Sequence, residues 1–232
     1  MVFAAGRGTR LRPFTDDRPK ALVEIEGVAL LEIVLGRLKA AGVSEVVINL
    51  HHFGEQIERF MAQQGNFGLV VHFSHERELL DTGGGLKQAA RWLAEAPGGS
   101  FLVHNVDVLS DIDLVALMRA HRESGALATL AAMPRTTARP LLFDGEAWLC
   151  GRSTTAGEHL VRSPSGGVVP LGFAGIHAVS CDLLPLLSEE GAFPIIEAYL
   201  RLAGEGRAIR AFRVDGSRWR DAGRPADLRP LT

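Results

Sequence analysis

Short apolar runs alternate with helix-patterned segments over the first 133 residues of the chain. The apolar runs are typical of buried strands and lie at residues 2–5, 45–50, 68–73, 100–109 and 126–133. Segments with apolar residues at helical spacing separate them, at residues 29–42, 54–65, 84–96 and 111–125. In the last of these, Asp111 is the candidate N-cap. The alternation predicts parallel strands joined by right-handed crossovers, with helices on both faces of the sheet.

The pattern changes after residue 133. Residues 139–152 and 158–180 indicate shorter strands with turn residues between them, which favours antiparallel pairing. A helix at residues 193–206 has Pro194 near its first turn, and the chain closes with segments at 208–214 and 217–223. With no linker visible, we predict a single α/β domain over residues 1–232: a doubly wound, Rossmann-like, mostly parallel sheet (residues 1–133) to which the C-terminal half (134–232) adds a small β-rich lobe.

Composition narrows the class of protein. The 232 residues are 47% hydrophobic and 22% charged, with a net charge of −2, which argues against a general nucleic-acid or membrane-binding surface. Cys150 and Cys181 stand in unrelated contexts, so we expect no disulfide framework and a cytoplasmic location. No apolar run reaches the roughly 18 residues of a membrane span, and we expect no signal peptide. Because residue 2 already looks like strand, it stays open whether the natural N-terminus is longer.

The stretch after the first strand, GRGTRLRPFTDDRPK, combines glycines with many cations. Glycines at the carboxyl end of a strand in such a sheet let the backbone approach a ligand and direct amides toward an anion. For G-R-G alone, a tight turn with solvated arginines is the alternative. Leu11 stands where a dinucleotide-binding motif has its third glycine, and no lysine directly follows a second glycine as in a P-loop.

The complete string resembles the signature of sugar-1-phosphate nucleotidyltransferases, the sugar-nucleotide pyrophosphorylases. The residues in family order are Gly6, Gly8, Thr9, Arg10, Leu11, Arg12, Pro13, Thr15, Pro19 and Lys20. Three later segments, DTGGGLKQA, HNVDV and RWRDAGRPADL, resemble the family's base-binding, metal-binding and closing motifs. The details INLHHFGEQI and TGGG are most similar to the N-acetylmuramate-1-phosphate uridylyltransferase branch, which serves cell-wall recycling, and mannose- and heptose-1-phosphate guanylyltransferases are its neighbours.

The resemblance implies a reaction without a nucleophilic side chain. A sugar 1-phosphate attacks the α-phosphorus of a nucleoside triphosphate and pyrophosphate leaves. The attacking phosphate has a second pKa of about 6 and is already an anion at neutral pH, so no general base is needed. Backbone amides, cationic side chains and Mg²⁺ must then position two polyanions and stabilise the leaving charge.

By the same resemblance, the first half of the chain binds the nucleotide. The implied nucleotide contacts are Ala4, Ala5, Gly6, Gly8, Thr9, Arg10, Gly83 and Gly84. Arg10 would hold the leaving pyrophosphate, and Lys20 would neutralise the sugar phosphate and the α-phosphate. Gly83 and Gly84 would read the base through the backbone, which leaves uridine, guanosine and thymidine open. Arg10, Lys20 and Asp107 are the expected catalytic residues.

The second half is expected to complete the metal site and bind the sugar. The resemblance places Mg²⁺ between Asp107, after an apolar strand, and Asp221, near the C-terminus. Val106 replaces the glycine of the family's usual N-G-D, which crowds the ligand without removing the carboxylate. The common Glu-Lys-Pro sugar motif is absent, and Arg152 is the nearest cation. The expected sugar-phosphate contacts are Lys20, Asn105, Gly175 and Glu197.

Other functions remain as alternatives. A catalytically silent subunit could keep the fold and bind a nucleotide sugar as an effector, but it would lose the charged residues that are present here. A nicotinamide-dependent oxidoreductase is disfavoured by the glycine spacing. His51 and His52 lack a metal-binding pattern and are candidates for the edge of a sugar pocket. We expect an enzyme that acts as a monomer or small homo-oligomer on a nucleoside triphosphate and a sugar 1-phosphate, with no nucleic-acid partner.

Overall fold

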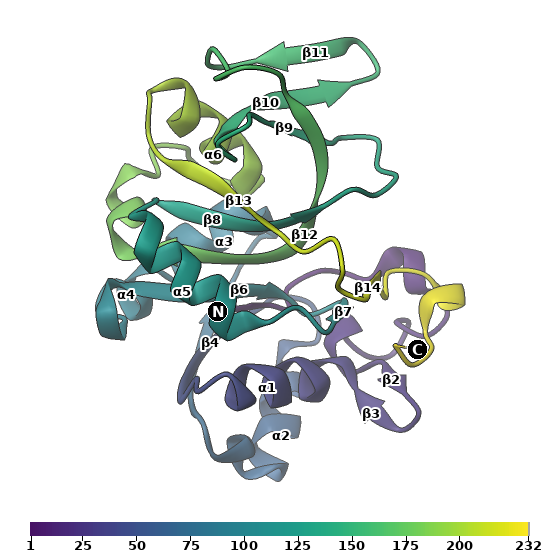
Figure 1. Cartoon of the computed structure of the whole chain (residues 1–232). Coiled ribbons are helices and arrows are strands. Elements are labelled where there is room, and N and C mark those ends of the chain that lie inside the picture. Colours follow the sequence, from purple (N-terminus) through teal and green to yellow (C-terminus); the bar gives the residue numbers. More distant parts are fainter. Residues whose placement is uncertain (232) are drawn as a thin grey trace.

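The first strands form the parallel centre of one sheet. In the computed structural model, which describes residues 1–231, β1 (Val2–Phe3) lies between β4 (Glu45–Leu50) and β6 (Ser100–Asn105). It pairs in parallel with both, and β5 (Val70–His75) extends the sheet in parallel beyond β4 (Figure 1). The carboxyl ends of all four strands therefore gather at one edge, where a doubly wound sheet binds its ligands.

The sheet becomes mixed beyond β6. The long strand β12 (Val169–Ser180) runs antiparallel between β6 and β8 (Ala128–Met133), and β13 (Ile209–Arg213) pairs in parallel with β8. β8 therefore keeps the predicted parallel direction relative to β6, but β12 lies between the two strands. Most of β12 is buried, as a strand with neighbours on both sides must be.

The strands within residues 139–180 pair in antiparallel fashion, as predicted. β9 (Leu141–Phe143) pairs with β10 (Leu149–Thr154), and β10 pairs with β11 (Gly157–Leu160). The first residues of β12 pair with β9 and its last residues pair with β6. The β-rich part of the C-terminal half therefore continues the main sheet, and its outermost strand β11 is exposed along its length.

Helices cover the two faces of the sheet. On one face lie α1 (Leu30–Ala40), α2 (Gly54–Gln63) and α5 (Leu114–Ser124). On the other lie α3 (Asp81–Gln88), α4 (Ala90–Leu93) and α6 (Ile195–Gly204). Val46 and Val47, adjacent on β4, belong to different apolar clusters because successive strand residues point to opposite faces. Short 3-10 turns lie at Thr9–Leu11, Lys20–Leu22, Gly65–Gly68, Pro97–Gly99, Cys181–Leu186 and Pro225–Asp227.

Two helix starts differ from the prediction. Helix α3 begins at Asp81, so its glycines lie inside the helix and not before it. Helix α5 begins later than predicted, and its N-cap is Asp113, whose side chain accepts a hydrogen bond from the Ala116 amide at 2.9 Å. Asp111 instead accepts hydrogen bonds from the backbone and side chain of Arg218, at 2.8 and 2.7 Å, and thereby binds the C-terminal segment.

The C-terminal segment packs against the opening stretch of the chain. β14 (Trp219–Asp221) pairs with β7 (Val108–Ser110), and Figure 1 shows this end of the chain beside the hairpin of β2 (Glu24–Ile25) and β3 (Val28–Ala29). Leu11, Leu109 and Ala222 share one apolar cluster there. Among residues 1–231, no helix has both the length and the apolar character needed to cross a bilayer.

Candidate active site

The loop after β1 is held in a defined shape. The Ala4 amide donates a hydrogen bond to the Asn49 side-chain oxygen at 2.7 Å, which fixes the start of the loop to the end of β4. Gly8 has a φ of +64°, and an added Cβ would lie 2.9 Å from Cγ2 of Thr15. It would also lie 3.1 Å from Cβ of Lys20. Glycine is thus required at position 8 by conformation and by space, and it brings Lys20 close beneath the loop.

Lys20 and Asp107 form an ion pair at the carboxyl end of β6. The Lys20 ammonium donates to Oδ2 of Asp107, and both side chains are largely buried. Asp107 lies between β6 and β7, and its carbonyl accepts a hydrogen bond from the Ala222 amide at 2.7 Å. This bond and the pairing of β14 with β7 bring Asp221 beside Asp107.

The surroundings of the Asp221 carboxyl group disfavour its ionised form. Burial raises its pKa, and the negative charge of Asp107 raises it further, while the cations Lys20 and Arg10 act in the opposite direction. Its Oδ1 is buried and has no hydrogen-bond partner within residues 1–231. An added Cβ on Gly223 would lie 2.5 Å from this oxygen and 3.0 Å from Nη2 of Arg10, so a glycine is needed where the two side chains meet.

These residues fit a magnesium ion. Two neighbouring carboxylates, one with an orphaned buried oxygen, are the donor type that Mg²⁺ prefers. In the described part of the chain, no cluster of three or more acidic, histidine or cysteine side chains could hold a metal ion. A two-carboxylate site suits a cation that keeps several waters and binds substrate phosphates.

A cavity of about 200 Å³ opens between the loop and the strand ends. Six of the residues predicted from the sequence line it: Ala4, Ala5, Gly6, Lys20, Asn105 and Asp107. A larger cavity of about 800 Å³ lies near Met1, and none of the predicted site residues lines it. The smaller cavity is therefore where the chemistry expected from the sequence can take place.

Glu76 also lines this cavity and was not predicted. Its Oε1 accepts a hydrogen bond from the Asn49 side-chain amide at 2.6 Å, and its Oε2 accepts one from the Leu80 amide at 2.9 Å. Burial raises the pKa of Glu76, against the lowering effect of these hydrogen bonds. The available signal was a polar residue just past a parallel strand, but the predicted strand stopped at residue 73 and β5 continues to His75.

The glycines predicted to read the base are packed against another segment. Gly83 and Gly84 are buried, and both amides donate to the Phe193 carbonyl, at 2.8 and 3.4 Å. Their neighbours Asp81 and Thr82 line the cavity in their place. The amides of both glycines are thus already engaged, and their role toward the base stays a prediction.

The predicted sugar contacts fall into two places. Gly175 has a φ of +75°, and its added Cβ would lie 2.9 Å from Nδ2 of Asn105, so these two residues are in contact at the cavity. Glu197, in the first turn of α6, forms a partly exposed ion pair with Arg152 of β10. Arg152 is the cation nearest to the place in the sequence where the Glu-Lys-Pro motif was expected.

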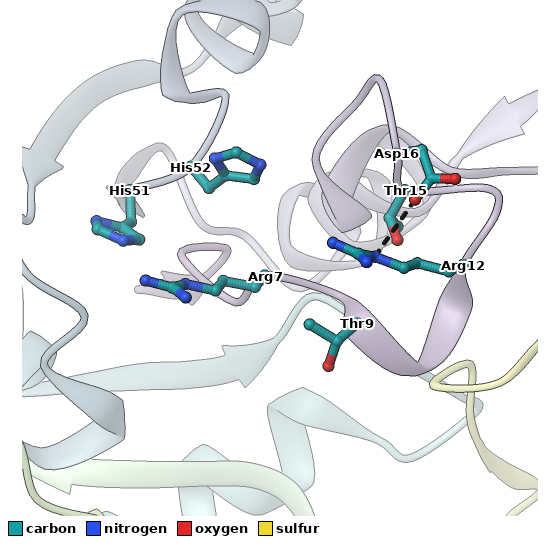
Figure 2. Close-up of a pocket in the computed structure, with 7 residues that line it drawn as sticks. All are labelled: Arg7, Thr9, Arg12, Thr15, Asp16, His51 and His52. Carbon is teal, nitrogen blue, oxygen red and sulfur yellow. Dashed lines mark ion pairs between the residues drawn. The ribbon is translucent and has the colours of Figure 1, made fainter.

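The remaining predicted residues lie to either side of the loop. Arg10 is exposed and lies beside Asp221. Thr9 lines a second cavity, of about 370 Å³, together with His51 and His52 (Figure 2). The two histidines follow β4, whereas Asn105 ends β6 on the other side of β1, and their place at the edge of a sugar pocket stays a prediction.

Comparison with known proteins gives the family. The sequence profile described as Nucleotidyl transferase matches residues 1–142. N-acetylmuramate alpha-1-phosphate uridylyltransferase of Caulobacter vibrioides is 35% identical over 219 residues, 89% of this chain and 85% of that protein. The protein of the same name from Neisseria meningitidis serogroup B is 44% identical over 82% of this chain and 84% of its own length. Mannose-1-phosphate guanyltransferase of Gibberella zeae is 30% identical over 98% of this chain and 61% of its own length.

The fold comparison agrees. The crystal structure of HddC from Yersinia pseudotuberculosis complexed with GMP-PN superposes with a TM-score of 0.74, covering 98% of this chain and 94% of that one at 19% identity. The chain is therefore a nucleotidyltransferase. Within that class it belongs to the family that transfers nucleotidyl groups to sugar 1-phosphates.

Proposed function

We propose that the protein transfers uridylate from UTP to N-acetylmuramic acid 1-phosphate with the help of Mg²⁺. The convergence of Lys20, Asp107 and Asp221 beside the glycine loop carries the proposal, because this reaction needs a cation and a metal-binding carboxylate pair at one phosphorus atom. The UDP-sugar product would belong to cell-wall recycling, and we expect the reaction to take place in the cytoplasm.

In the reaction, one phosphorus–oxygen bond forms and another breaks. An oxygen of the sugar phosphate bonds to the α-phosphorus, the bond from that phosphorus to the oxygen bridging to the β-phosphate breaks, and pyrophosphate leaves with the electron pair. Lys20 lies within the cavity, where its ammonium neutralises the approaching phosphate. Asp107 and Asp221 would hold Mg²⁺, which supplies charge neutralisation to the phosphates when bound.

Lys20 has to change partner during this cycle. Without substrates its ammonium binds Oδ2 of Asp107, so the two charges balance each other in a largely buried place. A phosphate offers Lys20 another anion, which frees the carboxylate for the metal. Neither charged group is left unpaired in either arrangement, which avoids the large penalty for an isolated buried charge.

Glu76 favours a base with an imino N–H group. A carboxylate that already accepts two hydrogen bonds can accept another through its remaining lone pairs. Uracil, thymine and guanine carry a ring N–H that can donate to it, whereas adenine and cytosine present an unprotonated ring nitrogen there. This supports UTP and leaves GTP as its rival.

The sugar assignment rests on the two uridylyltransferases that align over most of the chain. A lactyl ether on the sugar requires space, and Gly175, which is packed against Asn105, adds no side chain at that part of the site. A mannose- or heptose-type 1-phosphate with GTP is the second candidate, because the Gibberella zeae guanyltransferase aligns with 98% of this chain and Glu76 also fits guanine.

The test is a matrix of kcat/KM values for UTP and GTP against N-acetylmuramic acid 1-phosphate and mannose 1-phosphate, with Mg²⁺ or with EDTA. We expect the UTP and muramate pair to give the highest value and EDTA to abolish turnover. A higher value for GTP with mannose 1-phosphate would support the second candidate. A tenfold preference corresponds to only about 1.4 kcal/mol, so each reaction needs replicate titrations.

A further inference from the structure

Strand β12 is irregular next to the proposed sugar contact. Between its pairings with β8 at Phe173 and at His177, β12 advances by four residues while β8 advances by only two. Gly175, inside this β-bulge, has a φ of +75°. A β-bulge changes the direction of the chain and of its side chains, and bulges are common beside active sites. This one brings Gly175 into contact with Asn105, which lines the active-site cavity.

Two side chains bind the carbonyl groups of this bulge. Arg135, which follows the end of β8, donates a hydrogen bond from Nη2 to the Phe173 carbonyl at 2.9 Å. Trp219 of β14 donates one from Nε1 to the Ala174 carbonyl at 2.7 Å. The Arg135 guanidinium also lies over the Trp219 ring, 4.5 Å from its centroid, which is the geometry of a cation–π contact. The two side chains therefore hold the bulge together, as one Arg135–Trp219 pair.

The place of Arg135 is tightly defined. An added Cβ on Gly172 would lie 2.5 Å from Cγ of Arg135 and 2.6 Å from its Nε, so a glycine is needed there to admit the side chain. The Nε atom is buried and has no hydrogen-bond partner within residues 1–231. An unpaired buried donor is unfavourable. The stack on Trp219 and the bond to the Phe173 carbonyl must outweigh this cost.

The Arg135–Trp219 pair connects two parts of the active site. Trp219 and Asp221 point to the same face of β14, because alternate residues of a strand share a face. The bulge that the pair binds carries Gly175. Arg135 and Trp219 themselves lie outside the active-site cavity. They can therefore influence the reaction by fixing other residues, and not by touching a substrate.

We propose that Arg135 is a positioning residue for the sugar 1-phosphate, which fixes the β12 bulge in the shape that presents Gly175 and Asn105 to this substrate. The inference rests on the proposed function for the placement of the sugar at these two residues. A planar guanidinium can stack on an indole ring and donate in its own plane at the same time. A lysine ammonium, which is a point charge, replaces only part of this arrangement.

The test uses two variants that disturb Arg135 in different ways. Arg135→Gln removes the charge and the stack, whereas Gly172→Ala keeps every charge and displaces the arginine side chain. We expect each to raise the KM for the sugar 1-phosphate by about tenfold and to leave the triphosphate KM unchanged, because a small misplacement of binding groups has effects of this size. Arg135→Lys should restore the sugar-phosphate KM only in part. The substrates are the pair with the highest kcat/KM in the matrix above.

Arg210→Gln is the matched control. Arg210 stacks over Trp148, 4.7 Å from the ring centroid, and donates from Nη2 to the Glu146 carbonyl at 2.8 Å, so it makes the same two kinds of contact away from the site. Its loss should leave both KM values unchanged. An unchanged sugar-phosphate KM in Arg135→Gln or in Gly172→Ala would overturn the proposal. So would an equal rise of the two KM values, since a general loss of structure affects both substrates.

Hydrogen–deuterium exchange tests the bulge without any substrate. The amides of residues 172–176 should exchange faster in Arg135→Gln and in Gly172→Ala than in the wild type, and at the wild-type rate in Arg210→Gln. Exchange that is unchanged in Arg135→Gln would show that this side chain does not hold the bulge, and the proposal would fail. If the wild type turns over no sugar phosphate at all, the proposed function fails, while the exchange rates still decide whether Arg135 fixes this segment.

Discussion

The proposed base side and the proposed sugar side of the active site are built from different kinds of contact. On the base side, hydrogen bonds of 2.6 to 2.9 Å join the Ala4 amide, Asn49, Glu76 and the Leu80 amide in a buried chain. On the sugar side, Arg152 and Glu197 form an ion pair whose side chains are 32% and 45% exposed, next to the exposed strand β11. A buried polar chain is costly to break, whereas an exposed ion pair contributes at most about 1 kcal/mol. The base side is thus constrained by the fold, and the sugar side can change with the substrate.

The largest loss of activity is expected at a metal-binding carboxylate, between the base side and the sugar side. Asp221→Asn should lower kcat/KM by about 10²–10³ for both substrates, as for loss of one electrostatic contributor to the transition state. The measurement is the steady-state rate with saturating Mg²⁺, beside the wild type in EDTA.

Folding provides the control for this variant. Because burial raises the pKa of Asp221, its ionised form is destabilised in the folded protein, so the neutral asparagine should leave the Tm unchanged or higher. Wild-type turnover by Asp221→Asn would remove this residue from the metal site. A lower kcat/KM for only one of the two substrates, the triphosphate or the sugar 1-phosphate, would show that the Asp221 carboxylate acts on that substrate's side of the site alone.

The next effect is a loss of stability, and it concerns the packing between α3 and the segment that leads into α6. Gly83 of α3 packs against the segment that leads into α6, and an added Cβ would lie 2.8 Å from the Phe193 carbonyl oxygen and overlap its ring. Gly83→Ala should therefore lower the free energy of unfolding by about 1–3 kcal/mol, measured by urea denaturation.

Gly36→Ala is the matched control for that variant. Gly36 also lies within a helix, α1, but an added Cβ there has no neighbour within 4 Å. We expect this change to stabilise the protein by up to about 1 kcal/mol through helix propensity. Equal effects of the two variants would mean that α3 and α6 are not tightly packed where the base side and the sugar side join.

Gly83 also shows how far the sequence alone could reach. The helix was predicted to begin at residue 84, but α3 starts earlier because Asp81 and Thr82 provide its first turn. What requires the small residue at position 83 is a contact with Phe193, a residue more than a hundred positions away. No local pattern reveals such a contact, whereas the alternation of apolar runs predicted the parallel centre of the sheet and most of its helices.

The charged residues of the site also differ in how far the sequence alone could predict them. Resemblance to a family signature led to Asp107 and Asp221, and the pairing of β14 with β7 is what brings them together. Asn49 and Glu76 lie at the carboxyl ends of neighbouring parallel strands, a position that periodicity can indicate once the strand ends are known. Arg152 and Glu197 meet only because α6 packs against β10, so their pairing depends on tertiary structure alone.

A smaller effect is expected on the base side. Glu76→Gln keeps one acceptor oxygen and places an amide where the second carboxylate oxygen accepts from a backbone N–H. It should raise the KM for the nucleoside triphosphate by about 10- to 100-fold, at roughly 1.4 kcal/mol per tenfold change, and leave the KM for the sugar phosphate unchanged. Initial rates with each substrate varied in turn measure both constants.

The control for Glu76→Gln is Glu78→Gln, two residues further along and exposed. Both variants lose one negative charge, so a general effect of net charge on triphosphate binding would appear in both. A triphosphate KM that rises equally in the two variants would contradict a specific contact between Glu76 and the base.

The smallest effect, and the sharpest test of the comparison, is expected on the sugar side. Arg152→Gln breaks a half-exposed ion pair, so its free energy of unfolding should change by less than about 1 kcal/mol. If Arg152 and Glu197 contact the sugar phosphate, the KM for that substrate should rise by several-fold to about tenfold, which corresponds to roughly 1.4 kcal/mol, with the triphosphate KM unchanged. Arg207→Gln, an exposed arginine after α6, controls for the loss of a surface charge.

A double-mutant cycle with Glu197→Gln decides whether the two side chains act together. Non-additive effects on the sugar-phosphate KM would mean that the pair acts as one unit, since residues in contact couple and distant ones do not. Additive or absent effects, with stability unchanged, would make the pair a surface feature and leave Asn105 and Gly175 as the sugar contacts. Neither result requires a change in the fold. Residues on the sugar side can therefore change with the substrate without destabilising the buried base side.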